Sequence, residues 1–155
     1  MFSGSEIVEI GIQIEVNGRD FYEALILKSA SEKAKEIFKF LAGEEEDHID
    51  VFKEILSSVK AYDPPESYPV EYFEYMRALA SQHVFTKAHK GKETAEQIKD
   101  DKEALDIAIG FEKDSIEFYE AMKKIVLTKD HPLLNALIVQ EHTHLNRLSE
   151  LKKTL

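Results

Sequence analysis

The sequence contains no cysteine, no tryptophan and only four prolines among its 155 residues. Without cysteine the chain forms no disulfide, no zinc ribbon, no iron–sulfur cluster and no cysteine-bound iron module. No apolar run approaches the roughly 20 residues that a membrane-spanning helix needs. The first ten residues lack the basic flank and the apolar block of a signal peptide. We therefore expect a cytoplasmic protein that does not interact with membranes.

Basic residues are few compared with acidic ones. The chain has 20 lysines and arginines against 30 aspartates and glutamates, a formal net charge of −10. Binding to nucleic acid relies on clustered basic residues, so this balance argues against it. Motifs for a serine nucleophile and glycine loops that hold phosphates are also missing. Most acidic side chains are expected on solvated helix surfaces, and acidity alone predicts no function.

The apolar pattern has the period of helices and gives no strand signal. Hydrophobic residues make up 43% of the chain and charged residues 32%, which is typical of a globular domain. We predict one all-α domain spanning residues 1–155. Its four long helices are expected at about residues 5–27, 31–60, 101–127 and 130–155. Ser31 and Asp130 are expected to cap the second and fourth helices, and Pro132 fits a first helical turn.

A long crossover, about residues 61–100, separates the second and third helices. It starts with the proline-rich stretch YDPPESYP, which cannot continue a helix. A short amphipathic helix is expected at VEYFEYMRALASQ, followed by a polar segment, KAHKGKETAEQIKDD. Two short connections and one long one favour a ferritin-like four-helix bundle over a simple up-and-down bundle.

Two of the predicted helices place a glutamate and a histidine where core leucines are expected. At steps of three and four residues, the second helix presents Phe38, Leu41, Glu45, His48, Phe52 and Ile55 on one face. The fourth helix repeats the pattern with Leu134, Leu137, Glu141, His144, Leu148 and Leu151. A single Glu-x-x-His pair arises by chance, but two copies in the same register on core-facing stripes indicate a shared site.

The other two helices supply one glutamate each. Glu15 and Glu112 lie on apolar stripes, 97 positions apart, and each precedes a tyrosine, Tyr22 or Tyr119, by seven residues. The two halves of the chain thus repeat, which predicts two helical hairpins related by an approximate two-fold axis. Four buried carboxylates need compensation, and two divalent cations would neutralise them. Carboxylates with little imidazole suit iron or manganese, and zinc less specifically.

At these residues the sequence resembles the rubrerythrin-related branch of the ferritin-like superfamily. The resemblance covers nearly the whole chain and is carried by QIEVNGRDFYEA, EEEDHIDVF, GFEKDSIEFYEA and QEHTHLNRL. It implies a di-iron centre in which Glu45 and Glu141 bridge the two metals. The other implied ligands are terminal carboxylates and one histidine per ion: Glu15, Glu112, His48 and His144. Tyr22 and Tyr119 are implied hydrogen-bond donors that orient the glutamates, with simple aromatic packing as the alternative.

The resemblance implies an oxidoreductase that reduces hydrogen peroxide or dioxygen in oxidative-stress defence. It also implies a homodimer, with exchange of helices through the crossover as one arrangement. Two features depart from rubrerythrins proper: Ser115 replaces an additional glutamate, and the cysteine-bound iron module is missing. An external electron donor such as a rubredoxin would be needed. Two alternatives stay open, a ferroxidase or iron-storage protein and a non-catalytic metal-binding scaffold.

The remaining polar candidates are expected outside the site. The histidines expected on the surface, in the crossover or at a helix start are His83, His89, His131 and His142. The acidic neighbours of Glu45 are expected to be solvated: Glu44, Glu46 and Asp47.

Overall fold

The computed structural model describes residues 4–62, 70–83 and 85–155. Its helices are α1 (Gly4–Lys28), α2 (Glu32–Tyr62), α3 (Val70–Gln82), α4 (Lys90–Glu96), α5 (Asp101–Met122) and α6 (His131–Lys153), with a 3-10 turn, η1 (Thr128–Asp130). Within these residues there is no strand, and the predicted all-α fold class is confirmed. None of the described helices is long and apolar enough to cross a lipid bilayer.

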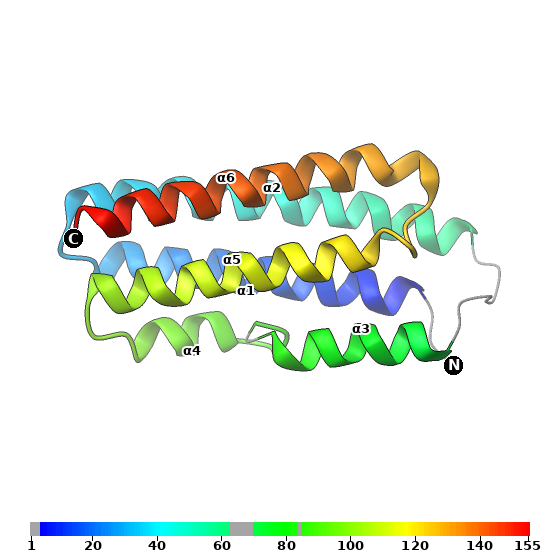
Figure 1. Cartoon of the computed structure of the whole chain (residues 1–155), viewed down its shortest axis with the longest axis horizontal. Coiled ribbons are helices and arrows are strands. Elements are labelled where there is room, and N and C mark those ends of the chain that lie inside the picture. The colour runs from blue at the N-terminus through cyan, green and yellow to red at the C-terminus, as the bar shows by residue number, and fades with distance from the viewer. Residues whose placement is uncertain (1–3, 63–69, 84) are drawn as a thin grey trace.

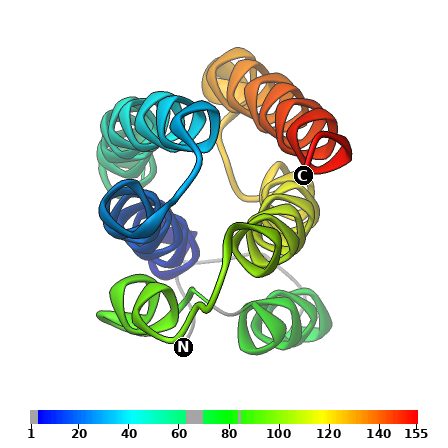
Figure 2. The same cartoon turned by 90° about the vertical axis from the view of Figure 1, so that its left-hand side faces the viewer.

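The four long helices α1, α2, α5 and α6 lie side by side as a bundle (Figure 1). α1 packs mainly against α2, and α5 packs against α6. Viewed along the bundle, α4 lies against α1 and α3 lies against α5, on the side away from α2 and α6 (Figure 2). The two short helices therefore cover the α1–α5 face, while the α2–α6 face carries no added helix in the part of the chain that is described.

Side-chain caps fix where two of the bundle helices begin. The Ser31 hydroxyl accepts a hydrogen bond from the Ala34 N–H at 3.2 Å, so α2 starts at the predicted cap. The Asp100 carboxylate accepts from the Glu103 N–H at 2.8 Å and caps α5 in the same way. Each cap satisfies an amide that has no partner within its own helix.

Two predicted helix ends are wrong. The helix expected to run to residue 127 ends at Met122, because the chain turns there and buries Ile125 and Val126, which are 2% and 4% exposed. Asp130 precedes α6 as predicted, but its side chain makes no capping hydrogen bond. Pro132 does lie in the first turn of α6.

One of the two short helices in the crossover was predicted from the sequence, and the other was not. α3 has the predicted bounds, whereas the segment predicted to be merely polar contains α4. The proline-rich segment that precedes α3 lies outside the described residues. α4 has only two buried residues, Gly91 and Ala95, so it shows no broad apolar stripe that a sequence pattern could detect.

Asn17 of α1 holds the crossover in place. Its buried amide nitrogen donates to the carbonyls of Phe85 and Lys87 at 2.7 and 2.6 Å, and its amide oxygen accepts from the Gly91 N–H at 3.1 Å. A Cβ on Gly91 would come within 1.9 Å of the Asn17 carbonyl oxygen, so only glycine permits this approach. The chain leading to α4 is therefore fixed directly against α1.

Candidate metal centre

The predicted stripes of α2 and α6 both face the bundle core. Every residue of the two stripes is buried: Phe38, Leu41, Glu45, His48, Phe52 and Ile55 on α2, and Leu134, Leu137, Glu141, His144, Leu148 and Leu151 on α6. Both glutamates are 0% exposed and both histidines 1% exposed. The helical period explains this placement, because residues three and four apart share one face. Each Glu-x-x-His pair thus lies in the middle of an apolar row.

Glu15 of α1 and Glu112 of α5 complete the polar cluster from the other side of the bundle. Both are 0% exposed. Each accepts a hydrogen bond from a tyrosine on the opposite helix: Tyr119 donates to Glu15 at 2.6 Å, and Tyr22 donates to Glu112 at 2.7 Å. Burial, together with the charge of the partner glutamate, raises the pKa of both tyrosines well above the ordinary value, so both remain donors. The two contacts fix one oxygen of each glutamate.

The six residues form two overlapping sets of potential ligands. One set comprises Glu15, Glu45, His48 and Glu141, and the other comprises Glu45, Glu112, Glu141 and His144. Within each set, one atom per residue lies within 4.8 Å of the others. Glu45 and Glu141 belong to both sets, so each can use its two oxygens on two neighbouring ions. The arrangement suits two cations that share two carboxylates and have one histidine each.

The cluster has more polar atoms than the protein can satisfy. Ten buried side-chain oxygens and nitrogens in the described residues lack a hydrogen-bond partner, and all except Asp130 Oδ2 belong to these six residues. Unpaired buried polar atoms are costly, and each such atom needs an explanation. Bound cations supply one, because every unpaired carboxylate oxygen becomes a ligand. The residues present therefore fit a two-metal centre.

The electrostatics of the protein without metal agree with this interpretation. Burial and the charges of Glu112 and Glu15 raise the pKa of Glu141 well above its ordinary value. Burial lowers the pKa of His48, but the charge of Glu15 and hydrogen bonds outweigh it and raise the pKa to about 9. The raised pKa values of Glu141 and His48 mean that, without metal, protons on these two side chains offset part of the negative charge of the cluster. Metal ions would have to displace these protons in order to bind.

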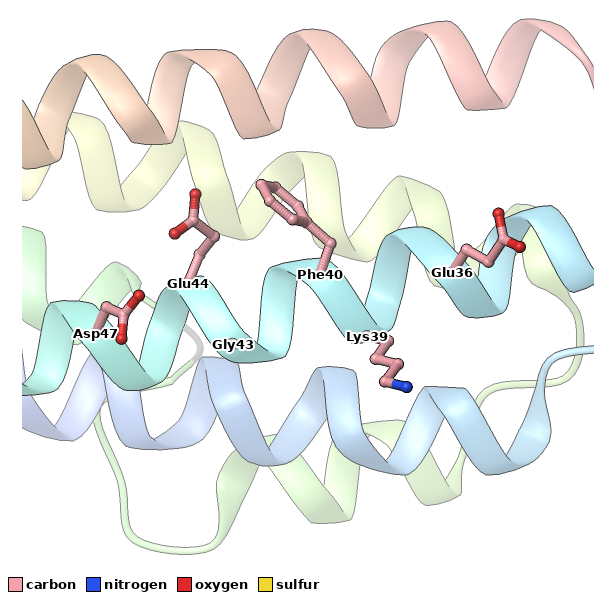
Figure 3. A pocket seen from close by; sticks show the side chains of 6 residues that line it. All are labelled: Glu36, Lys39, Phe40, Gly43, Glu44 and Asp47. Carbon is pink, nitrogen blue, oxygen red and sulfur yellow. The ribbon is translucent and has the colours of Figure 1, made fainter.

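The outer nitrogens of the two histidines contact residues that the sequence did not assign to the site. His48 Nε2 lies 2.7 Å from Gln140 Oε1, and His144 Nε2 lies 3.7 Å from Glu44 Oε1. Glu44 was expected to be solvated and not a ligand; its side chain is 24% exposed, lies outside both ligand sets and is directed toward α6 (Figure 3). The sequence does contain a hint of both contacts, because Glu44 and Gln140 occupy corresponding positions directly before Glu45 and Glu141.

His83 is the clearest error of the sequence interpretation. It was expected on the surface or in a linker, yet it is 3% exposed. Its Nδ1 accepts a hydrogen bond from the Phe85 N–H at 3.1 Å, so Nε2 carries the proton and donates to the Ser115 hydroxyl at 3.0 Å. Burial lowers the pKa of His83 to about 4, which keeps the ring neutral. At the position where rubrerythrins proper carry the additional glutamate, the structure therefore has Ser115 hydrogen-bonded to His83, and both side chains are buried.

The other histidines lie away from the cluster, as expected. His89 and His142 are exposed, and His131 is the first residue of α6. His131 Nε2 lies 3.0 Å from the Val126 carbonyl, which ties the helix start to the preceding turn. Glu46 is an exposed residue whose carboxylate pairs with Arg19 at 2.8 Å.

Fold and cluster together define a ferritin-like, metal-binding four-helix bundle. A family model described as Rubrerythrin matches residues 6–152, and the chain belongs to this family. Its fold is similar to that of a Thermotoga maritima protein described as a ferritin-like diiron-carboxylate protein, with a TM-score of 0.70 and 24% sequence identity over 98% of this chain and 95% of that chain. No curated protein matches the chain. The resemblance found in the sequence is confirmed.

Proposed function

We propose that the cluster binds two iron ions as the protein's resident cofactor. Glu45 and Glu141, which belong to both ligand sets, would be shared by the ions, while Glu15 and Glu112 would be terminal ligands and His48 and His144 would each serve one ion. The observation that carries this proposal is the concentration of unpaired buried ligand atoms on these residues. Four carboxylates with two imidazoles favour iron or manganese over zinc, which in structural sites is held mostly by thiolates. Family membership favours iron.

The protein is then an oxidoreductase that reduces hydrogen peroxide, or dioxygen, in oxidative-stress defence. When bound, the two ferrous ions supply the two electrons that, with two protons, convert one peroxide into two waters. The chain itself excludes bulk water, because all six ligands are buried. Tyr22 and Tyr119 hold the terminal carboxylates in place. Because the chain has no cysteine, electrons come from a separate donor such as a rubredoxin.

Anaerobic iron loading followed by peroxide addition tests this function. We expect about two irons per chain, and about one peroxide consumed for every two ferrous ions oxidised. Glu45→Ala should abolish both results, whereas Glu46→Ala, which alters an exposed neighbour on the same helix, should leave them unchanged. Iron binding without oxidation of the bound iron by either peroxide or dioxygen would refute the oxidoreductase. A single tightly held zinc without redox chemistry would support a metal-stabilised scaffold instead.

Iron handling is the second candidate. It is favoured by a shallow hollow on α2, whose lining includes three carboxylates, Glu36, Glu44 and Asp47, and one cation, Lys39 (Figure 3). Of these carboxylates, Glu44 lies 3.7 Å from His144 and could attract a cation to the cluster. A ferroxidase or storage protein would oxidise many irons per chain and assemble into a large shell. Particle sizing and the number of irons oxidised per chain separate it from a peroxidase, which works as a small oligomer such as a homodimer.

A further inference from the structure

Each histidine of the cluster turns one ring nitrogen inward and the other outward. His48 Nδ1 lies 2.8 Å from Glu141 Oε1 and 3.5 Å from Glu15 Oε2. His144 Nδ1 lies 3.7 Å from both Glu112 Oε1 and Glu141 Oε1. Nδ1 is therefore the atom that would bind metal in both cases. Nε2 is left to carry a proton, and the group that it faces controls the orientation and donor strength of the ring.

The outward nitrogens face different chemical groups. His48 Nε2 lies 2.7 Å from the amide oxygen of Gln140 and hydrogen-bonds to it, whereas His144 Nε2 makes no hydrogen bond and faces the carboxylate of Glu44 at 3.7 Å. Gln140 and Glu44 occupy corresponding positions, because each directly precedes the glutamate shared by the two sets, and they lie 96 residues apart. The contacts cross the bundle: the residue on α2 serves the histidine on α6, and the residue on α6 serves the histidine on α2. At this pair of corresponding positions, the two halves of the chain therefore differ by one unit of charge.

The surroundings make this difference in charge effective. Glu44 is only 24% exposed, so water screens its charge incompletely. Figure 3 shows Glu44 and Phe40 both directed from α2 toward α6. The Phe40 ring lies 6.1 Å from the His144 ring, and the Arg147 guanidinium lies 4.2 Å from the centre of the Phe40 ring. Phe40 thus lies between Arg147 and His144, while the Glu44 carboxylate lies 3.7 Å from the outer nitrogen of His144.

We propose that Glu44 and Gln140 are positioning residues that make the two metal sites unequal, with the His144 site binding a divalent cation more tightly. This inference rests on the proposed two-metal centre. The Glu44 carboxylate, 3.7 Å from the outer nitrogen of His144, places a negative charge beside that imidazole, whereas the Gln140 amide beside His48 is neutral. The negative charge favours a cation bound at the inner nitrogen of His144. The His144 site is consequently filled first.

Cobalt(II) titration followed by calorimetry and visible absorption tests the inference without redox chemistry. The wild-type chain should bind two Co²⁺ in two steps whose affinities differ by about tenfold or more. Glu44→Gln should weaken the tighter step and Gln140→Glu should strengthen the weaker one, so that both variants approach a single step. Glu46→Gln is the matched control, because it removes the same charge from an exposed site two positions along α2.

The double variant Glu44→Gln/Gln140→Glu is the decisive measurement. It has the net charge of the wild type and exchanges the two groups, so it should restore two unequal steps. Equal steps in the wild type, a single step in the double variant, or an effect of Glu44→Gln no larger than that of Glu46→Gln would each overturn the inference.

Peroxide consumption by the iron-loaded wild type, measured in parallel, separates the two proposals. If peroxide is consumed while the two steps are equal, only the inference fails. If the steps behave as expected and peroxide is not consumed, the oxidoreductase fails and the inference stands. Fewer than two Co²⁺ per chain would overturn both.

Discussion

Replacing Glu45, which belongs to both sets of potential ligands, by leucine should stabilise the metal-free protein while abolishing metal binding. Glu45 is 0% exposed, and neither of its carboxylate oxygens has a hydrogen-bond partner. Its neighbours along the stripe, Leu41 and Phe52, are buried apolar residues. Leucine is similar in size and continues this stripe without a polar atom. Glu45→Leu therefore removes a buried carboxylate that makes no hydrogen bond in the metal-free protein to offset its loss of hydration.

The size of the effect follows from the buried environment. Replacing buried ionic groups with apolar residues of similar volume often stabilises a protein by about 1–4 kcal/mol. For a chain of this length, 1 kcal/mol corresponds to about 2–4 °C in Tm, so we expect a rise of roughly 2–16 °C. In the presence of two equivalents of metal the order should reverse, since only the wild type gains free energy from binding both ions.

Urea unfolding and thermal scans of both proteins, with and without metal, measure this reversal. Glu54→Leu is the matched control, because Glu54 is exposed on the same helix and its replacement should change stability by about 0.5 kcal/mol or less. A Glu45→Leu protein that is less stable than the wild type in the absence of metal would refute the reasoning. It would mean that the carboxylate contributes more to the folded state than its missing hydrogen bonds indicate.

Three further substitutions probe the groups around the centre. Tyr119→Phe removes a 2.6 Å hydrogen bond to a buried carboxylate and should cost the metal-free protein about 1.5–3 kcal/mol in urea unfolding; no loss would show that the contact is incidental. Gly91→Ala places a Cβ 1.9 Å from a backbone oxygen of α1 and should cost about 1–3 kcal/mol, whereas Gly43→Ala, with nothing within 4 Å, should stabilise α2 by up to about 1 kcal/mol. The pKa of His83 is lowered to about 4, so its contribution to stability is complete above pH 6.5 and is lost as the pH falls toward 4. Over that range the wild type should lose about 3 kcal/mol more than His83→Gln, and parallel pH curves would contradict this.

The parts of the site that could be predicted are those set by the period of one helix. Glu45 and His48 are three residues apart, so they had to share a face, and the leucines and phenylalanines around them showed that this face is buried. The tyrosines were assigned to the glutamates, but not to particular ones. Each tyrosine bonds the glutamate of the other helix, and this depends on how α1 and α5 pack together.

The parts that could not be predicted depend on contacts between distant segments. His83 is buried because the chain after α3 returns to α5, where Ser115 and Phe111 meet the imidazole. No local pattern records that path. α4 was not predicted because its buried residues, Gly91 and Ala95, are small. They let α4 pack closely against α1, but they do not form the stripe of large apolar residues by which a helix is detected in a sequence. Glu44 lies about 100° around the helix from Glu45, off the core stripe, and only the nearness of α6 brings it to His144.

The crossover gives the two faces of the bundle different roles. On the α1–α5 face, Phe85 of the crossover packs 5.2 Å from Phe21 and 4.8 Å from Phe111, measured between ring centres, and seals the cluster with aromatic rings. On the α2–α6 face, the described chain leaves Phe40 40% exposed and Gln140 exposed, directly outside the histidines. In the described residues, the groups directly outside the cluster are therefore aromatic rings on the α1–α5 face and polar side chains on the α2–α6 face. On the same face, Glu44 and Gln140 differ in charge, so the side of the bundle that the described short helices leave uncovered is also the one on which the surroundings of His48 and His144 differ.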